Sequence, residues 1–147
     1  MDRQPLLQIL DLDISFKQGL SSARALRGID LTFYKEEIHG LVGESGSGKT
    51  VTSTTIMGLL PSPPASINRG KIVYKGKEIL PLPEQEKRLL RGREIAMVFQ
   101  EPGKYLNPAY KIGEQIMEML VLHKKMTKEE SRNRASEILD MVGLGKD

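Results

Sequence analysis

The chain has 147 residues and a formal net charge of +3 at pH 7, from 22 Lys and Arg against 19 Asp and Glu. Hydrophobic residues make up 39% and charged residues 28%, which is typical of one folded domain or of part of a larger one. The charge excess is too small to indicate nucleic acid, the absence of cysteine excludes disulfides and thiolate metal sites, and no run of about 20 apolar residues could span a membrane. The first 16 residues lack the apolar run and cleavage site of a secretory signal, so we expect none there.

Apolar and polar residues alternate in two places in the first part of the chain. This pattern predicts β-strands over residues 6–16 and 25–34, joined by a turn-like stretch at 18–22. The short apolar segment 38–42 predicts a buried strand. Residues 49–60 predict a helix that ends where a proline follows.

The middle of the chain alternates between proline-containing and apolar segments. Residues 61–70 predict a loop because of their prolines, and 71–76 predict a further strand and a turn. Residues 83–90 predict a short charged helix with proline in its first turn. The run "IAMVF" at 95–99 predicts another buried strand, and 100–110 predict an irregular loop.

Two helical patterns follow. Apolar residues at helical spacing predict a helix over 112–123. Thr127 and Glu130 form a capping-box pattern that opens a second helix, and Gly143 could end it. The apolar face of this second helix is expected at Ala135, Ile138, Leu139 and Val142.

A glycine-rich stretch carries the most specific chemical signal. The segment "GESGSGKT", residues 43–50, fits the phosphate-loop pattern G-x-x-x-x-G-K-[ST], with a predicted strand before it and a predicted helix after it. Glycine permits backbone conformations in which successive N–H groups point inward at an anion, and the helix adds its positive end. The alternative is a glycine-rich turn with a solvated lysine, which the flanking elements disfavour. We therefore predict that the loop binds a nucleoside triphosphate.

Each position in the loop has an expected role. Lys49 can reach the β- and γ-phosphates, and the Thr50 hydroxyl can ligate Mg²⁺. Gly43 is expected to make the turn out of the preceding strand, while Gly46 and Gly48 let the loop wrap closely around the phosphates. The predicted nucleotide-binding residues of this segment are Gly43, Glu44, Ser45, Gly46, Ser47, Gly48, Lys49, Thr50 and Val51.

Further segments carry a family resemblance. Taken in order along the chain, "GLVGESGSGKT", "LLPSPP", "RGREIAMVFQEP", "LNP" and "IGEQI" resemble the ATP-binding subunits of ABC transporters, and within them the dipeptide, oligopeptide and nickel import group. The resemblance implies an α/β fold, that of a P-loop NTPase of the ABC nucleotide-binding type. In this fold an N-terminal antiparallel β subdomain joins a RecA-like core, which would be incomplete here. It also implies ATP and Mg²⁺ as cofactors.

The resemblance implies roles for residues outside the loop. Gln100 matches the Q-loop glutamine, which contacts Mg²⁺ and the attacking water, so it is the predicted catalytic residue and a predicted metal ligand with Thr50. Phe16 matches the aromatic residue that stacks on adenine, although a core phenylalanine at a strand end is an open alternative. Tyr105, Leu106 and Tyr110 fall in the segment that would receive a cytoplasmic helix of the permease.

The sequence departs from the family pattern in several places. Glu36 stands where the family has glycine, and residues 103–105 replace the usual "MTS". The signature motif, the Walker B strand ending in Asp–Glu and the switch histidine are absent from the 147 residues. Neither His39 nor His123 is placed like that histidine, and Asp140 is expected on a helix. We therefore expect residues 1–147 to be the N-terminal portion of one ABC ATPase domain. With the base missing and sheet edges open, we expect little turnover from this portion alone, and either poor solubility or oligomers that cover those edges.

The expected function follows from these features. It is that of an ATP-binding subunit of an importer of peptides, nickel or related solutes, peripheral at the cytoplasmic face of the cell membrane. The expected partners are permease subunits, a second ATPase subunit in a head-to-tail homo- or heterodimer and, indirectly, a solute-binding protein, but no nucleic acid. A non-catalytic nucleotide-binding module acting in assembly or regulation is the alternative. An ATPase of DNA repair or of the ribosome and a P-loop kinase fit less well. Arg88, Arg91 and Arg93 are expected to be a solvated face without a functional role.

Overall fold

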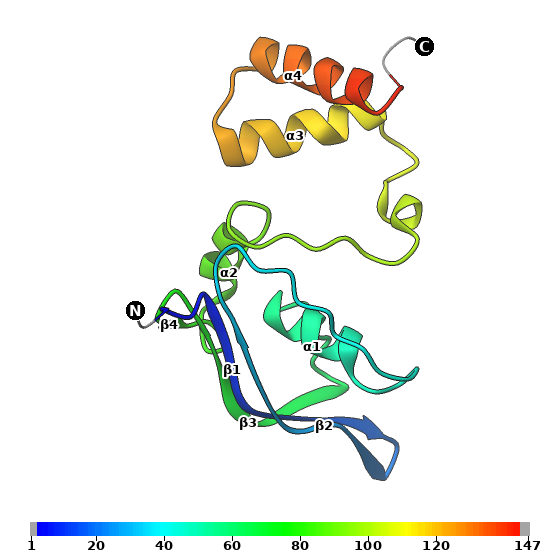
Figure 1. The fold of residues 1–147 in the computed structure, drawn as a ribbon. Helices are drawn as coiled ribbons and strands as arrows, with labels where there is room; N and C mark the ends of the chain where they lie inside the picture. Colours follow the sequence, from blue (N-terminus) through cyan, green and yellow to red (C-terminus); the bar gives the residue numbers. More distant parts are fainter. Residues whose placement is uncertain (1–2, 145–147) are drawn as a thin grey trace. The chain divides into compact units, whose positions relative to one another are not determined.

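The computed structural model describes residues 3–144, in two units that meet between Arg91 and Gly92 and are described separately below. The first unit holds an antiparallel sheet and two helices, and the second holds helices joined by irregular segments (Figure 1). None of the helices among the described residues combines the length and the apolar character needed to cross a bilayer.

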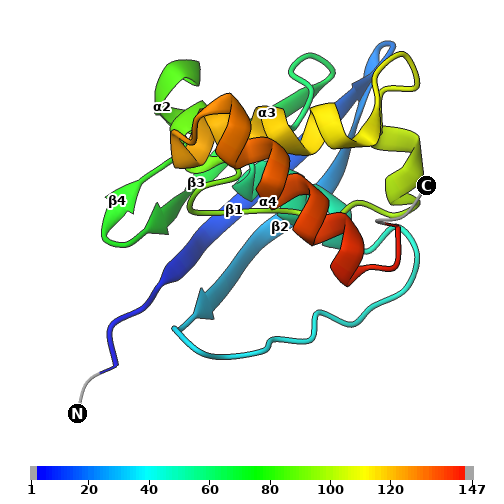
Figure 2. The ribbon, with the colours of Figure 1, turned by 90° about the horizontal axis from the view of Figure 1, so that it is seen from above.

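The sheet of the first unit has the strand order β2-β1-β3-β4, with every neighbouring pair antiparallel. Its strands are β1 (Leu7–Gln18), β2 (Ser21–Phe33), β3 (Ala65–Tyr74) and β4 (Lys77–Glu78). The long strands β1 and β2 run side by side (Figure 2). Alternate residues point to one face and form the core, with Ile9, Leu12, Ile14 and Ile72 fully buried.

A bulge in β1 keeps the apolar residues of this strand on a single face. Buried apolar positions are odd-numbered up to Ile9 and even-numbered from Leu12, and the register of β1 with both neighbours shifts between them. Asp11 lies at the shift with φ 45°, and Gly70 crosses it on β3 with φ 106°. A Cβ atom on Gly70 would lie 2.5 Å from the Leu12 Cα, so only glycine allows this close approach.

Two predicted buried strands are absent. Residues 38–42 and 95–99 have no regular strand structure, and Ile38, Val42 and Val98 are 103%, 95% and 86% exposed. A strand requires a neighbour that accepts and donates its main-chain hydrogen bonds. Among the described residues the strands form one antiparallel sheet that includes neither segment. The apolar composition of these two segments suits a buried strand, but it does not provide the neighbouring strands that a buried strand needs.

Three boundaries differ from the predicted ones. β3 begins at Ala65, inside the predicted loop, because pairing with β1 continues directly after the prolines. The predicted turn at 18–22 is confined to two residues between β1 and β2. Helix α1 (Lys49–Ile56) ends before the predicted proline because Gly58 takes φ 62° and its N–H, together with that of Leu59, closes a Schellman motif.

The second unit contains a helix pair. The helices of this unit are the short 3₁₀ helix η1 (Pro102–Tyr105), α3 (Ile112–Lys124) and α4 (Lys128–Met141). Of these, α3 and α4 pack together. The predicted capping box is confirmed: Thr127 Oγ1 accepts from Glu130 N at 3.2 Å, and Glu130 Oε2 accepts from Thr127 N at 2.8 Å. Ala135 is buried as expected, whereas Val142 is exposed because α4 ends before it.

Candidate nucleotide-binding site

The predicted phosphate loop lies immediately before α1, in the first unit. Gly46 and Gly48 take φ 81° and 93°, and Ser47 N donates to Glu44 O at 3.2 Å, which closes a turn within the loop. Gly48 is buried and forms the N-cap of α1. A Cβ atom at Gly48 would lie 2.5 Å from Leu26 Cδ2, so the end of the loop is seated directly on β2.

Lys49 holds the loop together through its ammonium group. Its Nζ donates to Gly43 O at 2.6 Å, to Glu44 O at 2.6 Å and to Ser47 Oγ at 3.1 Å. An ammonium has three donors, so the loop's own oxygens use all of them. The lysine is therefore at the centre of the loop, where it could exchange these acceptors for phosphate oxygens.

Gly43 has a different reason for being glycine than the predicted one. The segment before it is not a strand, so Gly43 does not turn the chain out of a strand, and its φ is not positive. A Cβ atom there would lie 2.7 Å from Ser47 Oγ. Gly43 thus lies where the loop folds back closely on itself, and a side chain there would displace the Ser47 side chain.

Helix α1 directs its N-terminal end at the loop. The N–H groups of the first turn of any α-helix, here Lys49 to Val51, have no partners within the helix and carry the positive end of the helix dipole. No acidic residue lies in this first turn. Thr50 is exposed, whereas Thr52, Ser53, Thr54 and Thr55 donate their hydroxyls to carbonyls of the preceding turn. The end of the helix is therefore suited to an anion.

The donor set available to a metal consists of neutral oxygens. No group of three His, Cys, Asp or Glu within residues 3–144 could hold a metal ion. The Thr50 hydroxyl and the Gln100 amide oxygen are hard donors of the kind that Mg²⁺ accepts, and Mg²⁺ commonly completes its shell with phosphate oxygens and water. The Thr50 hydroxyl therefore fits a magnesium ion that arrives with a nucleotide, whereas Gln100 lies in the second unit and its role as a metal ligand stays a prediction.

Phe16 and Gln100 lie in different units. Phe16 is half-buried on β1, paired with Ala23 of β2 and Ala65 of β3. Gln100 is exposed and comes just before η1. The structure brings residues 43–50 into one site, whereas the roles of Phe16 and Gln100 remain predictions.

The segment after Gln100 presents apolar groups. Tyr105, Leu106 and Tyr110 are all exposed. The Tyr105 ring stacks on Phe99, with a centroid distance of 4.4 Å. Asn107 N donates to Gln115 Oε1 at 2.9 Å, and this bond fixes the loop against the first turn of α3. The expected permease-docking residues are thus accessible on an ordered segment.

Arg91 is a residue whose importance the sequence analysis missed. The Arg91 side chain, which we expected to be solvated, is only 21% exposed. It donates hydrogen bonds to Met57 O and Gly58 O just beyond the end of α1. Arg88 and Arg93 are exposed, as expected. The signal in the sequence was Gly58, which ends the threonine-rich helix. A helix that ends there leaves main-chain carbonyls that need a hydrogen-bond donor from elsewhere.

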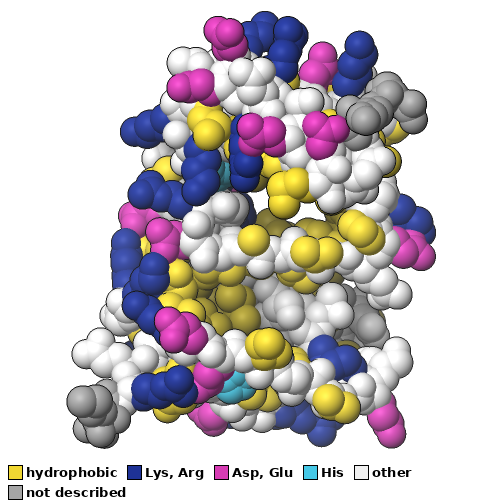
Figure 3. All heavy atoms as spheres, turned by 45° about the horizontal axis from the view of Figure 1, so that its top comes forward, with side chains coloured by type: hydrophobic (Ala, Val, Ile, Leu, Met, Phe, Trp, Pro, Cys, Tyr) yellow, Lys and Arg dark blue, Asp and Glu magenta, His cyan; other side chains and the backbone are white. Residues whose placement is uncertain are grey.

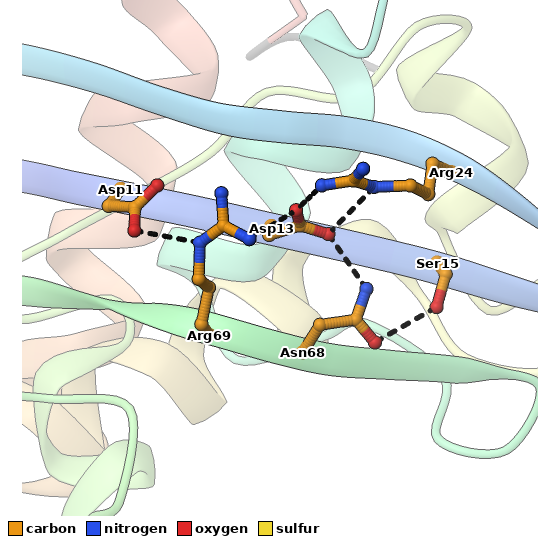
Figure 4. A network of polar contacts seen from close by, with 6 residues as sticks. All are labelled: Asp11, Asp13, Ser15, Arg24, Asn68 and Arg69. Carbon is orange, nitrogen blue, oxygen red and sulfur yellow. Dashed lines mark hydrogen bonds and ion pairs between the residues drawn. The ribbon is translucent and has the colours of Figure 1, made fainter.

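A polar network crosses the sheet near the bulge (Figure 4). The Asp13 side chain is 1% exposed and accepts hydrogen bonds from Arg24 on β2 and Asn68 on β3, while Arg69 lies 3.3 Å from its Oδ2. The hydrogen bond from Arg24 holds the pKa of the Asp13 carboxyl below its usual value, assisted by Asn68. All members are paired, so the network reads as a stabilising one.

Charged side chains of both signs are interspersed on the face drawn in Figure 3. No large surface of a single sign is seen there, in keeping with the small net charge.

Comparison with known proteins agrees with the fold. The family model described as ABC transporter matches residues 26–147, so the chain belongs to this family, whose cassettes are P-loop NTPases. Two solved structures share the fold: the ATP-binding cassette MJ0796 in a dimeric post-hydrolysis state bound to ADP and Pi (TM-score 0.78) and a dimeric MJ0796 structure (TM-score 0.79). Each is 26% identical, and the match covers 92% of this chain and 56% of that one.

Curated relatives are similar over nearly the whole chain. The oligopeptide transport ATP-binding protein OppD of Bacillus subtilis is 48% identical over 95% of this chain, and the dipeptide transport ATP-binding protein DppD of the same organism is 40% identical over 96%. The peptidoglycan transport ATP-binding protein YejF of Agrobacterium fabrum is 46% identical over 96%. The chain spans 39%, 42% and 26% of the lengths of OppD, DppD and YejF, respectively.

Proposed function

We propose that the chain is the nucleotide-binding part of the ATP-binding subunit of an ABC importer for peptides. The observation that carries the proposal is the phosphate loop, in which Lys49 Nζ lies within 2.6 Å of Gly43 O and Glu44 O at the N-terminal end of α1. The relatives OppD and DppD, named for oligopeptide and dipeptide transport, support peptides as the cargo. Nickel and related solutes belong to the same import group and are the second cargo class to test.

Binding of the phosphates would use groups of the first unit, and the resemblance adds Gln100 from the second unit. The main-chain N–H groups of residues 44–51 surround the phosphates, and the Lys49 ammonium exchanges its loop acceptors for β- and γ-phosphate oxygens. Thr50 and Gln100 hold Mg²⁺ with the phosphates, and Phe16 contacts adenine. Gln100 also orients the attacking water through its amide.

Hydrolysis would need groups beyond these. We infer that residues 1–147 are the N-terminal portion of one ABC ATPase domain, with the phosphate loop at 43–50 and the Q-loop around 100. A base for the water and charge stabilisation around the γ-phosphate are required for turnover. The signature motif, the Walker B carboxylates and the switch histidine supply them in the family, so this portion binds ATP with little turnover of its own.

The proposed partners follow from the same assignment. A second ATPase subunit would supply its signature loop in a head-to-tail dimer, and the dimeric MJ0796 structures support a dimer of cassettes. Permease subunits would dock at Tyr105, Leu106 and Tyr110, whose exposure supports this role, and the subunit would then lie at the cytoplasmic face of the membrane. A solute-binding protein would act indirectly through the permease.

Isothermal titration of the chain with MgATP tests the proposal. We expect saturable heat with one site per chain, and competition by MgADP and by tripolyphosphate, since the phosphates supply most contacts. Phosphate release should remain near the uncatalysed level. No heat and no competition from a sample whose circular dichroism shows a folded chain would contradict nucleotide binding.

A further inference from the structure

Helix α1 has low intrinsic stability. It has eight residues and a length of about 12 Å. Helices this short are marginal in isolation, and β-branched residues, which have modest helix propensity, occupy six of its eight positions: Thr50, Val51, Thr52, Thr54, Thr55 and Ile56. Its buried residues are Thr52 and Thr55, both polar. Residues 51–56 are all half-buried or buried, and contacts at the two ends of the helix add to this packing.

The N-terminal end is held by the sheet. Gly48 lies against the Leu26 side chain and the Ala25 carbonyl of β2, so that even a methyl group would not fit. This contact fixes where the helix begins. The direction of the helix axis is then set by the contacts at its C-terminal end.

The C-terminal end is held by Arg91. Arg91 Nε donates to Met57 O at 2.7 Å and Nη2 donates to Gly58 O at 2.9 Å. Both carbonyls follow the last turn of α1, where main-chain oxygens lack helical partners and the helix dipole is negative. A guanidinium thus satisfies the oxygens and the dipole together.

Glu84 orients the guanidinium. Its Oε1 and Oε2 accept from Arg91 Nη1 at 2.5 Å and Nη2 at 3.3 Å, a two-pronged contact from the start of α2 (Glu84–Leu90). The hydrogen bond from Arg91 lowers the pKa of Glu84, so this carboxylate stays charged. The planar fork of arginine can serve two carbonyls and a carboxylate at once, which a lysine ammonium cannot do in this geometry.

We propose that Arg91 is a positioning residue for the phosphate site, acting through the C-terminal end of α1. Because the N-terminal end of this short helix is held at β2, the position of its C-terminal end sets the direction of the helix axis. Holding Met57 and Gly58 therefore fixes the approach of Lys49 and Thr50, at the opposite end, to the phosphates. Displacements on the order of 1 Å at such a site can cost about 100-fold in function. The inference rests on the proposed nucleotide binding.

The test compares variants of the chain by titration with MgATP and with tripolyphosphate. Arg91→Met keeps the apolar stem and removes the donors, and we expect both dissociation constants to rise about tenfold. Arg91→Lys, which restores one donor and the charge, should recover part of the affinity. Arg88→Met is the matched control on the exposed part of α2 and should bind as the wild type does.

A second control separates positioning from general stability. Ile72→Val removes a methyl group from the sheet core on β3 and should lower the melting temperature, while α1, Arg91 and Glu84 keep their own residues. It should leave both dissociation constants unchanged. Equal affinity in Arg91→Met and wild type, or a loss matched by Ile72→Val, would overturn the inference.

The remaining outcomes are also decisive. Wild-type protein that binds neither ligand would remove the proposed function and the inference with it, whereas wild-type binding with an unaffected Arg91→Met removes the inference alone. If Arg91→Met does not fold, Glu84→Gln takes its place, since it leaves Arg91 present but less firmly oriented. We then expect about a threefold rise in both dissociation constants, and no change would reject the role of Arg91.

Discussion

The buried Asp13 carboxylate on β1 accepts hydrogen bonds from the Arg24 guanidinium on the neighbouring strand β2, from Nη2 and, at 3.3 Å, from Nε. Two residues further along β2, the Leu26 side chain meets Gly48 at the start of α1. The pair thus fixes the strand on which the phosphate loop rests. Truncating one partner of a buried ion pair is costly because the other charge is left uncompensated.

Asp13→Asn should lower the free energy of unfolding at neutral pH more than Asp11→Asn does, because the Asp11 side chain is 60% exposed. The hydrogen bond from Arg24 places the folded-state pKa of Asp13 below the ordinary value of 3.8. Its contribution is therefore complete above that value and is lost as the pH falls through the folded-state pKa. Urea unfolding from pH 7 downwards should show the gap between wild type and Asp13→Asn narrowing in acid. A gap that stays constant would contradict the assigned pairing.

Lys49→Ala should weaken MgATP binding about tenfold to a hundredfold while the fold survives, because a charge-assisted contact to phosphate is worth roughly 1.5–3 kcal/mol. The loop would also lose the bonds from Nζ to Gly43 O and Glu44 O. Titration calorimetry gives the affinity and circular dichroism checks the fold. Lys35→Ala, at an exposed lysine, is the control. Unchanged affinity in Lys49→Ala would exclude the role given to this ammonium.

Gly48→Ala should destabilise the chain and impair the site together. The residue has φ 93°, and the added methyl carbon would lie 2.5 Å from Leu26 Cδ2 and 3.1 Å from Ala25 O. We expect a loss of about 1–3 kcal/mol in urea unfolding, with weaker MgATP binding. Gly103→Ala is the matched control, since nothing lies within 4 Å of the added atom. Equal stability of the two variants would show that Gly48 is not confined as described.

Phe16→Leu should separate base binding from phosphate binding. If the ring contacts adenine, its loss should weaken MgATP binding several-fold to about tenfold, the worth of one aromatic contact, and leave tripolyphosphate unaffected. Competition titrations with the two ligands provide the measurement. Phe16→Tyr retains the ring and should bind as wild type. A parallel loss for both ligands would identify Phe16 as a packing residue.

Local patterns predicted the parts that local physics controls. The structure contains the two predicted strands β1 and β2, the capping box of Thr127 and Glu130, and a closed loop at residues 43–50. Each of these depends mainly on residues that are close in sequence. The predicted strands at 38–42 and 95–99 do not appear. Apolar composition alone cannot provide the partner strand that a ladder requires.

The sequence by itself determined the phosphate loop, because glycines and a lysine at fixed spacing before a helix define an anion site through main-chain geometry. Only the tertiary structure decided how that helix is held. The contact of Gly48 with Leu26 joins residues 22 positions apart, and that of Arg91 with Met57 joins residues 34 apart. Such pairs are chosen by the packing of whole elements, which no local pattern records.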